Sequence, residues 1–237
     1  MHDTPTSGAP AVIGDGRLGR VLARALGAGA PLRRGELPPA TARAVILAVP
    51  DGAIAPLAAA LAPGPPVGHC SGALTLDALA PHAERFSLHP LMTLTPASEP
   101  AALRGAGAAI AGSTPRALAL ARALAERVGL EPFTVADEDR ALYHAAATVA
   151  SNFLVTVEGI ADRLFAAAGV ERRHAAALAR ASLENWAADG ARRALTGPIA
   201  RGDDATVERQ RRALAARAPD LLPTFDALAE ATRALAA

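Results

Sequence analysis

Residues 11–26 decide the fold of this chain, and they read AVIGDGRLGRVLARAL. A short apolar run leads into a Gly-x-Gly-x-x-Gly pattern, and residues with helical spacing follow its last glycine. In such a strand–turn–helix unit, Gly14 permits the tight turn, Gly16 lets the backbone approach a pyrophosphate, and Gly19 allows helix and strand to pack closely. The helix N-terminus then presents free N–H groups to the phosphates. The pattern predicts a dinucleotide-binding loop formed by Gly14, Asp15, Gly16, Arg17, Leu18 and Gly19.

The choice of cofactor is expected to depend on residues 30–34, which predict a second strand and its end. At this position an acidic residue binds the ribose 2′-hydroxyl of NAD, whereas an arginine accommodates the 2′-phosphate of NADP. Arg33 and Arg34 therefore favour NADP. Glu36 is the NAD-compatible alternative, and a solvated arginine pair in a loop is the other interpretation.

Composition excludes several classes of protein. A net charge of +1 gives no basis for binding nucleic acid or an anionic membrane surface. One cysteine excludes an internal disulfide, and no Cys/His cluster has the spacing of a metal site. The sequence lacks a signal-like leader and any run of about 18 apolar residues, which predicts a cytoplasmic protein. It also contains no lysine, which excludes mechanisms that need a catalytic lysine.

The order of elements predicts two domains. Apolar strand-like runs alternate with helical segments as far as residue 133, which is typical of an open parallel sheet covered by helices. From residue 137 onward only helical segments follow, the first of them spanning 137–168 with an interruption at Gly159. The expected division is an α/β domain over 1–134 and an all-α domain over 135–237.

Candidate site residues lie where the predicted strands end, because open α/β sheets bind ligands at the carboxyl ends of their strands. One set is expected to contact the cofactor: Val49, Pro50, Asp51, Ser71 and Gly72. His89 ends another strand, where an imidazole can exchange a proton with a carbonyl or hydroxyl group. The alternative is a structural histidine packed against Pro90.

Scarce polar residues gather between positions 143 and 152. On a regular helix His144, Thr148 and Asn152 share one face, and Tyr143 and Ser151 lie beside them. Such groups need hydrogen-bonding partners when buried. A substrate and a neighbouring helix are the two candidate partners, and spacing does not separate them.

Residues 195–203 form a loop between two predicted helices and read LTGPIARGD. Arg201 in this loop can bind a carboxylate or phosphate through two parallel hydrogen bonds. Asp203 is expected to cap the helix that follows.

Taken together, these motifs resemble a bacterial family of Rossmann-like oxidoreductases with a helical C-terminal domain of unknown function. The resemblance covers nearly the whole chain, and its most specific segment is residues 194–203, ALTGPIARGD. The family is similar to a larger group that includes pyrroline-5-carboxylate, ketopantoate and β-hydroxyacid reductases. His89-Pro90 also resembles the His-Pro pair of prephenate dehydrogenases, in which the histidine is catalytic.

The resemblance implies a Rossmann-type parallel-sheet domain followed by an all-α domain like that of 6-phosphogluconate dehydrogenase. It further implies NADP as cofactor, a homodimer formed by the helical domains, an active site between the domains and a small-molecule substrate. The helical lysine of the β-hydroxyacid and ketopantoate enzymes is missing, and His144 and Asn152 are its nearest equivalents. Met92 and Gln210 also depart from the family pattern.

The sequence therefore predicts an NADP-dependent oxidoreductase acting on a carbonyl, hydroxyl or imine compound, such as a 2-oxo acid. The expected catalytic residues are His89, His144 and Asn152, and the expected substrate contacts are Tyr143, Thr148, Ser151 and Arg201. Two alternatives stay open: an NADP(H)-binding regulatory or scaffold protein without turnover, and a deazaflavin-linked NADP reductase.

Overall fold

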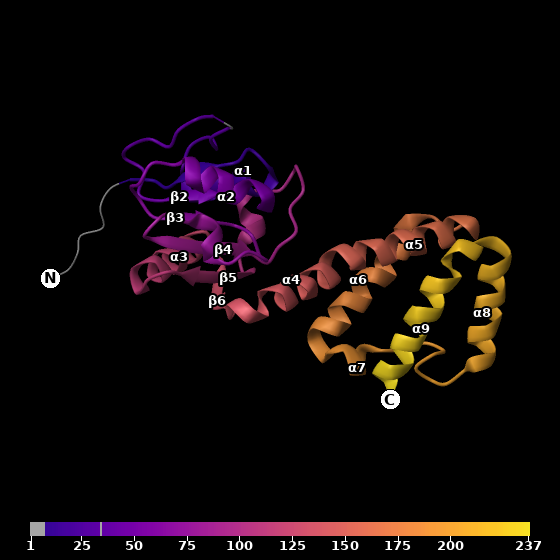
Figure 1. The fold of residues 1–237 in the computed structure, drawn as a ribbon. Helices are drawn as coiled ribbons and strands as arrows, with labels where there is room; N and C mark the ends of the chain where they lie inside the picture. Colours follow the sequence, from indigo (N-terminus) through magenta and orange to yellow (C-terminus); the bar gives the residue numbers. More distant parts are fainter. Residues whose placement is uncertain (1–7, 34) are drawn as a thin grey trace. The chain divides into compact units, whose positions relative to one another are not determined.

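The computed structural model describes residues 8–33 and 35–237 (Figure 1). Contacts between residues divide the chain into two compact units, Met1–Ala150 and Ser151–Ala237. Each unit is described by itself. Arg34, one of the two arginines expected to favour NADP, lies outside the described residues, so its role stays a prediction.

The first unit is built on a six-stranded sheet in the order β1-β2-β3-β4-β5-β6. All neighbouring strands are parallel except β4 and β5, which are antiparallel. The Rossmann-type α/β prediction is confirmed, with this one antiparallel pair as an addition to it. The strands are β1 (Ala11–Ile13), β2 (Val45–Leu47), β3 (Val67–His69), β4 (Arg85–Pro90), β5 (Gly107–Gly112) and β6 (Glu131–Thr134).

The strand expected over residues 30–34 is much shorter than predicted. It is reduced to a single parallel bridge between Leu32 and Ile13, at the edge of the sheet next to β1. Arg33 therefore directly follows the paired residue. This keeps it at the strand-end position where dinucleotide folds recognise the 2′-position of the ribose.

Helices cover both faces of the sheet, which explains why the central strands are continuously apolar. Val12 and Ile46 point to one face and pack with α1 (Arg17–Leu26) and α3 (Pro115–Arg127). Alternate residues point to the other face and pack with α2 (Asp51–Ala60) and the 3₁₀-helix η1 (Leu76–Leu79). The first unit is completed by η2 (Pro100–Leu103), η3 (Asp137–Asp139) and α4 (Arg140–Thr148).

The second unit is helical, as the sequence predicts. Its helices are α5 (Leu154–Ala167), α6 (Arg172–Asp189), α7 (Ala191–Ala194), α8 (Asp204–Arg217), η5 (Pro219–Leu221) and α9 (Leu222–Ala236). Asp203 caps α8 as expected, because its carboxylate accepts the Thr206 N–H at 3.0 Å. Among the described residues, no helix is long and apolar enough to cross a membrane.

The interruption expected at Gly159 is wrong, because α5 runs through that residue. The break lies earlier, in one turn of π-helix at Val149–Phe153 (η4). A π-turn closes its hydrogen bonds over five residues instead of four. The regular spacing that aligned His144, Thr148 and Asn152 therefore ends at Thr148.

Candidate functional site

The glycine loop has the close backbone contacts that the motif requires. Gly14 has a φ of +120°, and a Cβ there would lie 2.2 Å from the Ala48 carbonyl oxygen. A Cβ on Gly19 would lie only 1.8 Å from the Gly14 carbonyl oxygen. A Cβ on Gly16, by contrast, would meet no described atom within 4 Å. Gly16 thus faces open space at the start of α1, which fits a pyrophosphate approaching the backbone there.

A cavity of about 790 Å³ adjoins this loop, a volume within the usual range of small-molecule and cofactor sites. Arg33 and Glu36 both line it, so both of the residues proposed to select the cofactor face the same space. The Arg33 Nε lies 3.5 Å from an Asp15 carboxylate oxygen, and the Arg33 backbone N–H donates to Glu36 at 2.7 Å. The cavity is lined by Ile13, Gly14, Asp15, Arg33, Gly35, Glu36, Val49, Pro50, Gly52, Ala53, Pro56, Leu57 and Ala60.

The carboxylate of Asp15 is held between two arginines. Arg20 donates to it through Nε at 2.7 Å and Nη2 at 3.2 Å, and Arg33 Nε lies 3.5 Å from one of its oxygens. These guanidinium groups, Arg20 before Arg33, lower the pKa of Asp15. The negative charge at the loop is therefore compensated, which reduces its repulsion of phosphates. Arg17 reaches the Leu94 carbonyl oxygen at 3.3 Å, and Leu18 packs against the core beneath the loop.

Ser71 and Asp51 hold each other in place at the ends of β2 and β3. The Ser71 hydroxyl donates to Asp51 at 2.9 Å and accepts the backbone N–H groups of Ala73 and Leu74. Asp51 is the first residue of α2, but its side chain makes no cap hydrogen bond to that helix and binds Ser71 instead. These two side chains fix the turn that positions Gly72.

His69 is a buried neutral imidazole that sequence reasoning did not nominate. The Ser71 N–H donates to its Nδ1 at 3.2 Å, so the ring proton is on Nε2, which donates to the Thr75 carbonyl oxygen at 3.2 Å. Burial lowers the pKa of His69, which favours this uncharged form. A histidine at the end of an apolar strand carries no sequence signal that separates it from a catalytic one.

His89, at the end of β4, lies at the centre of the polar cluster. Its Nδ1 is 2.7 Å from the Tyr143 hydroxyl oxygen, and its ring packs edge-on against Tyr143 and His144, both from α4. A Cβ on Gly72 would lie 2.8 Å from His89 and 3.0 Å from His144, so Gly72 gives both rings their space. The structure thus brings together Gly72, His89, Tyr143 and His144.

The surroundings of His89 keep it uncharged at neutral pH. Burial comes first in lowering the pKa of His89 to about 4, and the electrostatic effects of the neighbouring His144 and Arg140 act in the same direction against the opposing effect of Asp51. Burial raises the pKa of Tyr143, so the phenol is protonated. His89 and Tyr143 are therefore two neutral groups joined by a hydrogen bond, along which a proton can pass from one to the other.

Arg140 and Ser87 complete the cluster, and sequence reasoning missed both. Arg140 is 1% exposed, donating through Nε to Asp137 at 2.8 Å and through Nη2 to the Ser87 hydroxyl at 3.2 Å. Its Nη1 is buried and has no hydrogen-bond partner among the described residues. The sequence did contain one local signal for Arg140, because positions 137, 140 and 143 have the spacing of neighbours on one face of a helix.

The remaining predicted site residues lie outside this cluster. The Thr148 hydroxyl donates to the His144 carbonyl oxygen at 3.1 Å, a bond within its own helix. Ser151, Asn152 and Arg201 belong to the second unit. Their expected roles toward a substrate stay predictions.

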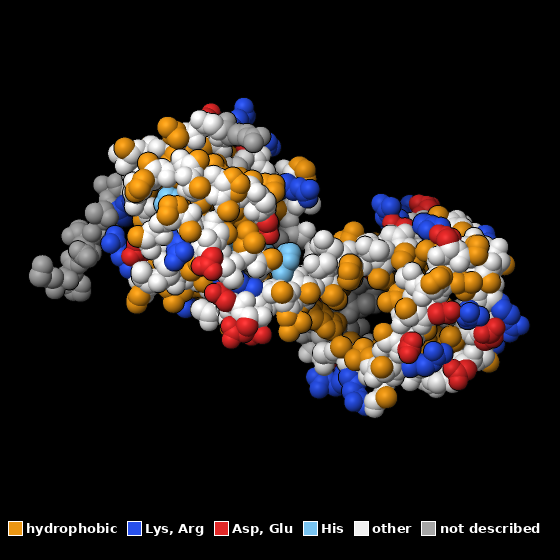
Figure 2. Space-filling view, in the orientation of Figure 1, with side chains coloured by type: hydrophobic (Ala, Val, Ile, Leu, Met, Phe, Trp, Pro, Cys, Tyr) orange, Lys and Arg blue, Asp and Glu red, His pale blue; other side chains and the backbone are white. Residues whose placement is uncertain are grey.

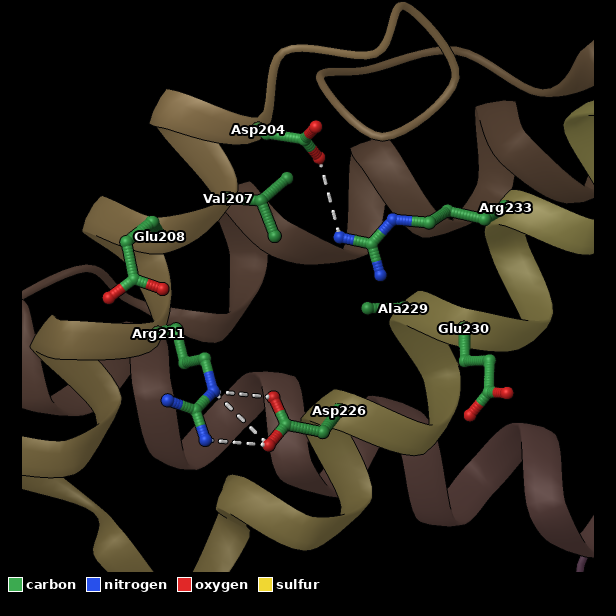
Figure 3. A pocket seen from close by; sticks show the side chains of 8 residues that line it. All are labelled: Asp204, Val207, Glu208, Arg211, Asp226, Ala229, Glu230 and Arg233. Atoms are coloured by element: carbon green, nitrogen blue, oxygen red, sulfur yellow. Dashed lines mark hydrogen bonds and ion pairs between the residues drawn. The ribbon is translucent and has the colours of Figure 1, made fainter.

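A cavity of about 430 Å³ lies between α8 and α9 in the second unit (Figure 3). Charged side chains cross it as ion pairs, Arg211 with Asp226 at 2.9 Å and Arg233 with Asp204 at 3.5 Å. These pairs join the two helices and leave both guanidinium groups already bound to carboxylates. The glycine-loop cavity and the His89 cluster are therefore the better candidate site.

Comparison with protein families gives a match over residues 107–232 to a domain of unknown function, DUF2520. The chain belongs to the DUF2520 family. The match covers more than half of the chain and includes the segments around Tyr143 and Arg201. No curated protein matches the sequence.

Several solved structures share the fold. A protein of Bacteroides fragilis named as a candidate NADP oxidoreductase has a TM-score of 0.82 at 19% identity, covering 95% of this chain and 98% of its own. A Thermotoga maritima protein has a TM-score of 0.75 at 24% identity, with 95% and 97% covered. For 1-pyrroline-5-carboxylate reductase from Streptococcus pyogenes the TM-score is 0.63 at 13% identity, with 94% and 97% covered. These likenesses confirm a Rossmann-like domain followed by a helical domain.

Proposed function

We propose that this protein is an NADP-dependent oxidoreductase that moves a hydride to or from a small carbonyl, hydroxyl or imine compound. The proposal rests on two features that lie on the same sheet. A glycine loop with an adjoining cavity suits a dinucleotide, and a neutral His89 bonded to Tyr143 stands at a neighbouring strand end. The names of the solved relatives from Bacteroides fragilis and Streptococcus pyogenes support the same class of reaction.

The residues at the loop fit NADP(H), which supplies or accepts the hydride when bound. Gly14, Gly16 and Gly19 would hold the pyrophosphate, since the backbone at Gly16 is open and α1 starts there. Arg33 would bind the 2′-phosphate, because it follows the last paired residue and lines the cavity. Val49 and Pro50 line the same cavity, and Gly72 is placed beside His89 for the nicotinamide end.

His89 is the residue we assign to proton exchange with the substrate. In reduction it gives a proton to the oxygen or nitrogen that has gained the electron pair, and in oxidation it takes that proton back. Its neutral ring has one protonated and one unprotonated nitrogen, so it can release a proton at one while it accepts a proton at the other. His144 beside it, and Asn152 and Arg201 of the second unit, are proposed to orient the substrate, with Arg201 binding a carboxylate such as that of a 2-oxo acid.

Titration with NADPH and NADH, followed by nicotinamide fluorescence, tests the cofactor assignment. We expect micromolar NADPH binding and much weaker NADH binding. Arg33→Ser should weaken NADPH binding by about 10- to 100-fold, since a charge-assisted phosphate contact contributes roughly 1.5–3 kcal/mol, while leaving NADH binding unchanged. Glu36→Gln is the matched control, because its effect should be small if Arg33 is decisive.

The outcomes separate the competing interpretations. Equal affinity for both nucleotides would transfer the selecting role to Glu36. Binding of neither nucleotide would contradict the hydride-transfer proposal. Tight NADPH binding without turnover of any 2-oxo acid or cyclic imine would favour a regulatory protein.

A second copy of the chain is the partner that we propose for the helical unit. Among residues 151–237 only five hydrophobic side chains are buried, too few for 87 residues to form a core alone: Ala175, Val207, Ala218, Leu221 and Ala229. Large apolar side chains are exposed instead, including Phe153 at 56%, Val155 at 70%, Leu178 at 64% and Trp186 at 56%. Figure 2 shows hydrophobic side chains gathered on the surface of this unit. A homodimer would bury them.

Phe153→Asp should convert the dimer to monomer, because a carboxylate in an apolar interface loses its hydration without gaining a partner. Sedimentation velocity measures the change. Leu37→Asp is the control, since Leu37 is 78% exposed in the first unit and its replacement should leave the dimer intact. A monomeric wild-type protein at micromolar concentration would contradict the proposal.

A further inference from the structure

Two neighbouring polar contacts join α4 to β4. The Tyr143 hydroxyl lies 2.7 Å from His89 Nδ1, and Arg140 Nη2 donates to the Ser87 hydroxyl at 3.2 Å. Ser87 and His89 are two residues apart on one strand, so their side chains share a face of the sheet. Arg140 and Tyr143 are three residues apart on one helix, which makes them neighbours. The guanidinium and the phenol therefore lie together over His89.

The positive charge of Arg140 is only partly neutralised by its surroundings. The guanidinium is nearly inaccessible to water, and its Nη1 has no acceptor among the described residues. Its one carboxylate partner, Asp137, has a side chain that is 61% exposed, so water screens that pair. A buried cation in this state stabilises negative charge on its neighbours.

We propose that Tyr143 is the proton donor behind His89 and that Arg140 is the positioning residue that stabilises the phenolate left on Tyr143. This inference rests on the proposed hydride-transfer function. The Tyr143 O–H donates to His89 Nδ1, which places the imidazole proton on Nε2, facing away from Tyr143.

The proton transfers balance in the direction of reduction. The hydride is the only electron pair that the substrate receives. His89 Nε2 gives its proton to the alkoxide oxygen formed from a carbonyl, or to the anionic nitrogen formed from an imine. At the same time Nδ1 takes the proton of Tyr143, so the imidazole stays neutral throughout. The negative charge ends on the Tyr143 oxygen beside Arg140, and a water molecule then returns a proton to the phenolate and leaves as hydroxide, so that one solvent proton is consumed for each hydride transferred.

Arg140 lowers the pKa of both Tyr143 and His89. Burial raises the pKa of Tyr143, and Arg140 acts against this rise by favouring the phenolate. Around His89, burial comes first in keeping the ring neutral, followed by His144 and Arg140 from α4 and His69 from β3, while Asp51 from α2 opposes them. Arg140 therefore favours proton loss from both members of the pair.

The test uses the fact that Tyr143 is the only tyrosine in the chain, so tyrosinate absorbance reports its ionisation alone. The absorbance is titrated against pH in the full-length protein without cofactor or substrate, for wild type, Arg140→Met and Arg140→Lys. Met removes the charge at similar volume, and we expect it to raise the pKa of Tyr143 by about one unit. Lys keeps the charge and should restore a pKa close to the wild-type value.

The direction of the shift separates the proposal from loss of structure. An unfolded Arg140→Met chain would show the pKa of a free tyrosine, about 10, which is lower than in the wild type. Circular dichroism at each pH shows whether the Arg140→Met protein is folded. If it is not, Arg140→Gln replaces it in the same titration. If a folded Arg140→Met or Arg140→Gln protein has the same Tyr143 pKa as the wild type, the proposed role of Arg140 is overturned.

The imidazole tautomer provides a second, independent measurement. Nitrogen-15 NMR of the histidine side chains should show His89 with its proton on Nε2 in the wild type. In Tyr143→Phe the signal should move toward a mixture of both tautomers. A proton found on Nδ1 in the wild type would overturn the proposal. Because neither measurement uses the cofactor, a failure here is distinct from a failure of the proposed hydride transfer.

Discussion

His89→Ala should strongly reduce turnover while leaving NADPH affinity close to the wild-type value. General acid–base catalysis contributes about 10²–10⁴-fold to rate, and we expect a loss of that size in kcat. The affinity should persist because the glycine loop and its cavity do not include His89. Steady-state kinetics with the first active substrate, and fluorescence titration with NADPH, measure the two quantities.

His89→Gln is the informative companion to the alanine variant. Its amide can donate a hydrogen bond near the position of Nε2 but cannot transfer a proton to the product. It should therefore keep more substrate affinity than the alanine variant and recover little of the rate. Turnover within a few-fold of the wild type in either variant would remove His89 from the mechanism.

Gly19→Ala should destabilise the first unit by roughly 3 kcal/mol or more, the upper range for overpacking. The new Cβ would lie 1.8 Å from the Gly14 carbonyl oxygen, and the backbone cannot easily shift because Gly19 lies within α1 and Gly14 directly follows β1. For a chain of this length such a loss lowers the thermal midpoint by roughly 6–12 °C. Thermal unfolding followed by circular dichroism measures it.

Gly16→Ala is the matched control, because it separates an effect on stability from an effect on cofactor binding. Its Cβ would enter open space, so stability should stay within about 0.5 kcal/mol of the wild type. NADPH binding should nevertheless weaken, because the methyl group would stand where the pyrophosphate approaches the backbone. A Gly16→Ala protein that binds NADPH normally would exclude this placement of the pyrophosphate.

Much of the architecture could be read from local patterns. The glycine loop, the alternation of strands and helices as far as residue 133, and the strand that contains His89 were all predicted with the type of element they form. Each depends on residues within about ten positions of one another, where hydrophobic period and turn chemistry are strong signals. The helical second unit followed from the absence of strand-like runs after residue 137.

Other features depended on contacts that local patterns do not contain. The sequence suggested an entirely parallel sheet, but β5 runs antiparallel to β4, and the pairing direction of strands is set by their packing partners. The break in the long helix falls at the π-turn rather than at Gly159, because a single glycine is tolerated inside a helix. Asp51 binds Ser71 instead of capping α2 because β3 brings Ser71 within reach.

The candidate site divides in the same way. The sequence by itself determined the dinucleotide loop and nominated His89 and Tyr143, since glycine spacing, strand ends and scarce residue types are visible in one dimension. Only the tertiary structure decided that these two side chains share a hydrogen bond, and that Arg140, Ser87 and His69 surround them. The physical reason is that a hydrogen bond needs its two heavy atoms within about 3 Å, and folding brings positions 89 and 143 together across 54 residues.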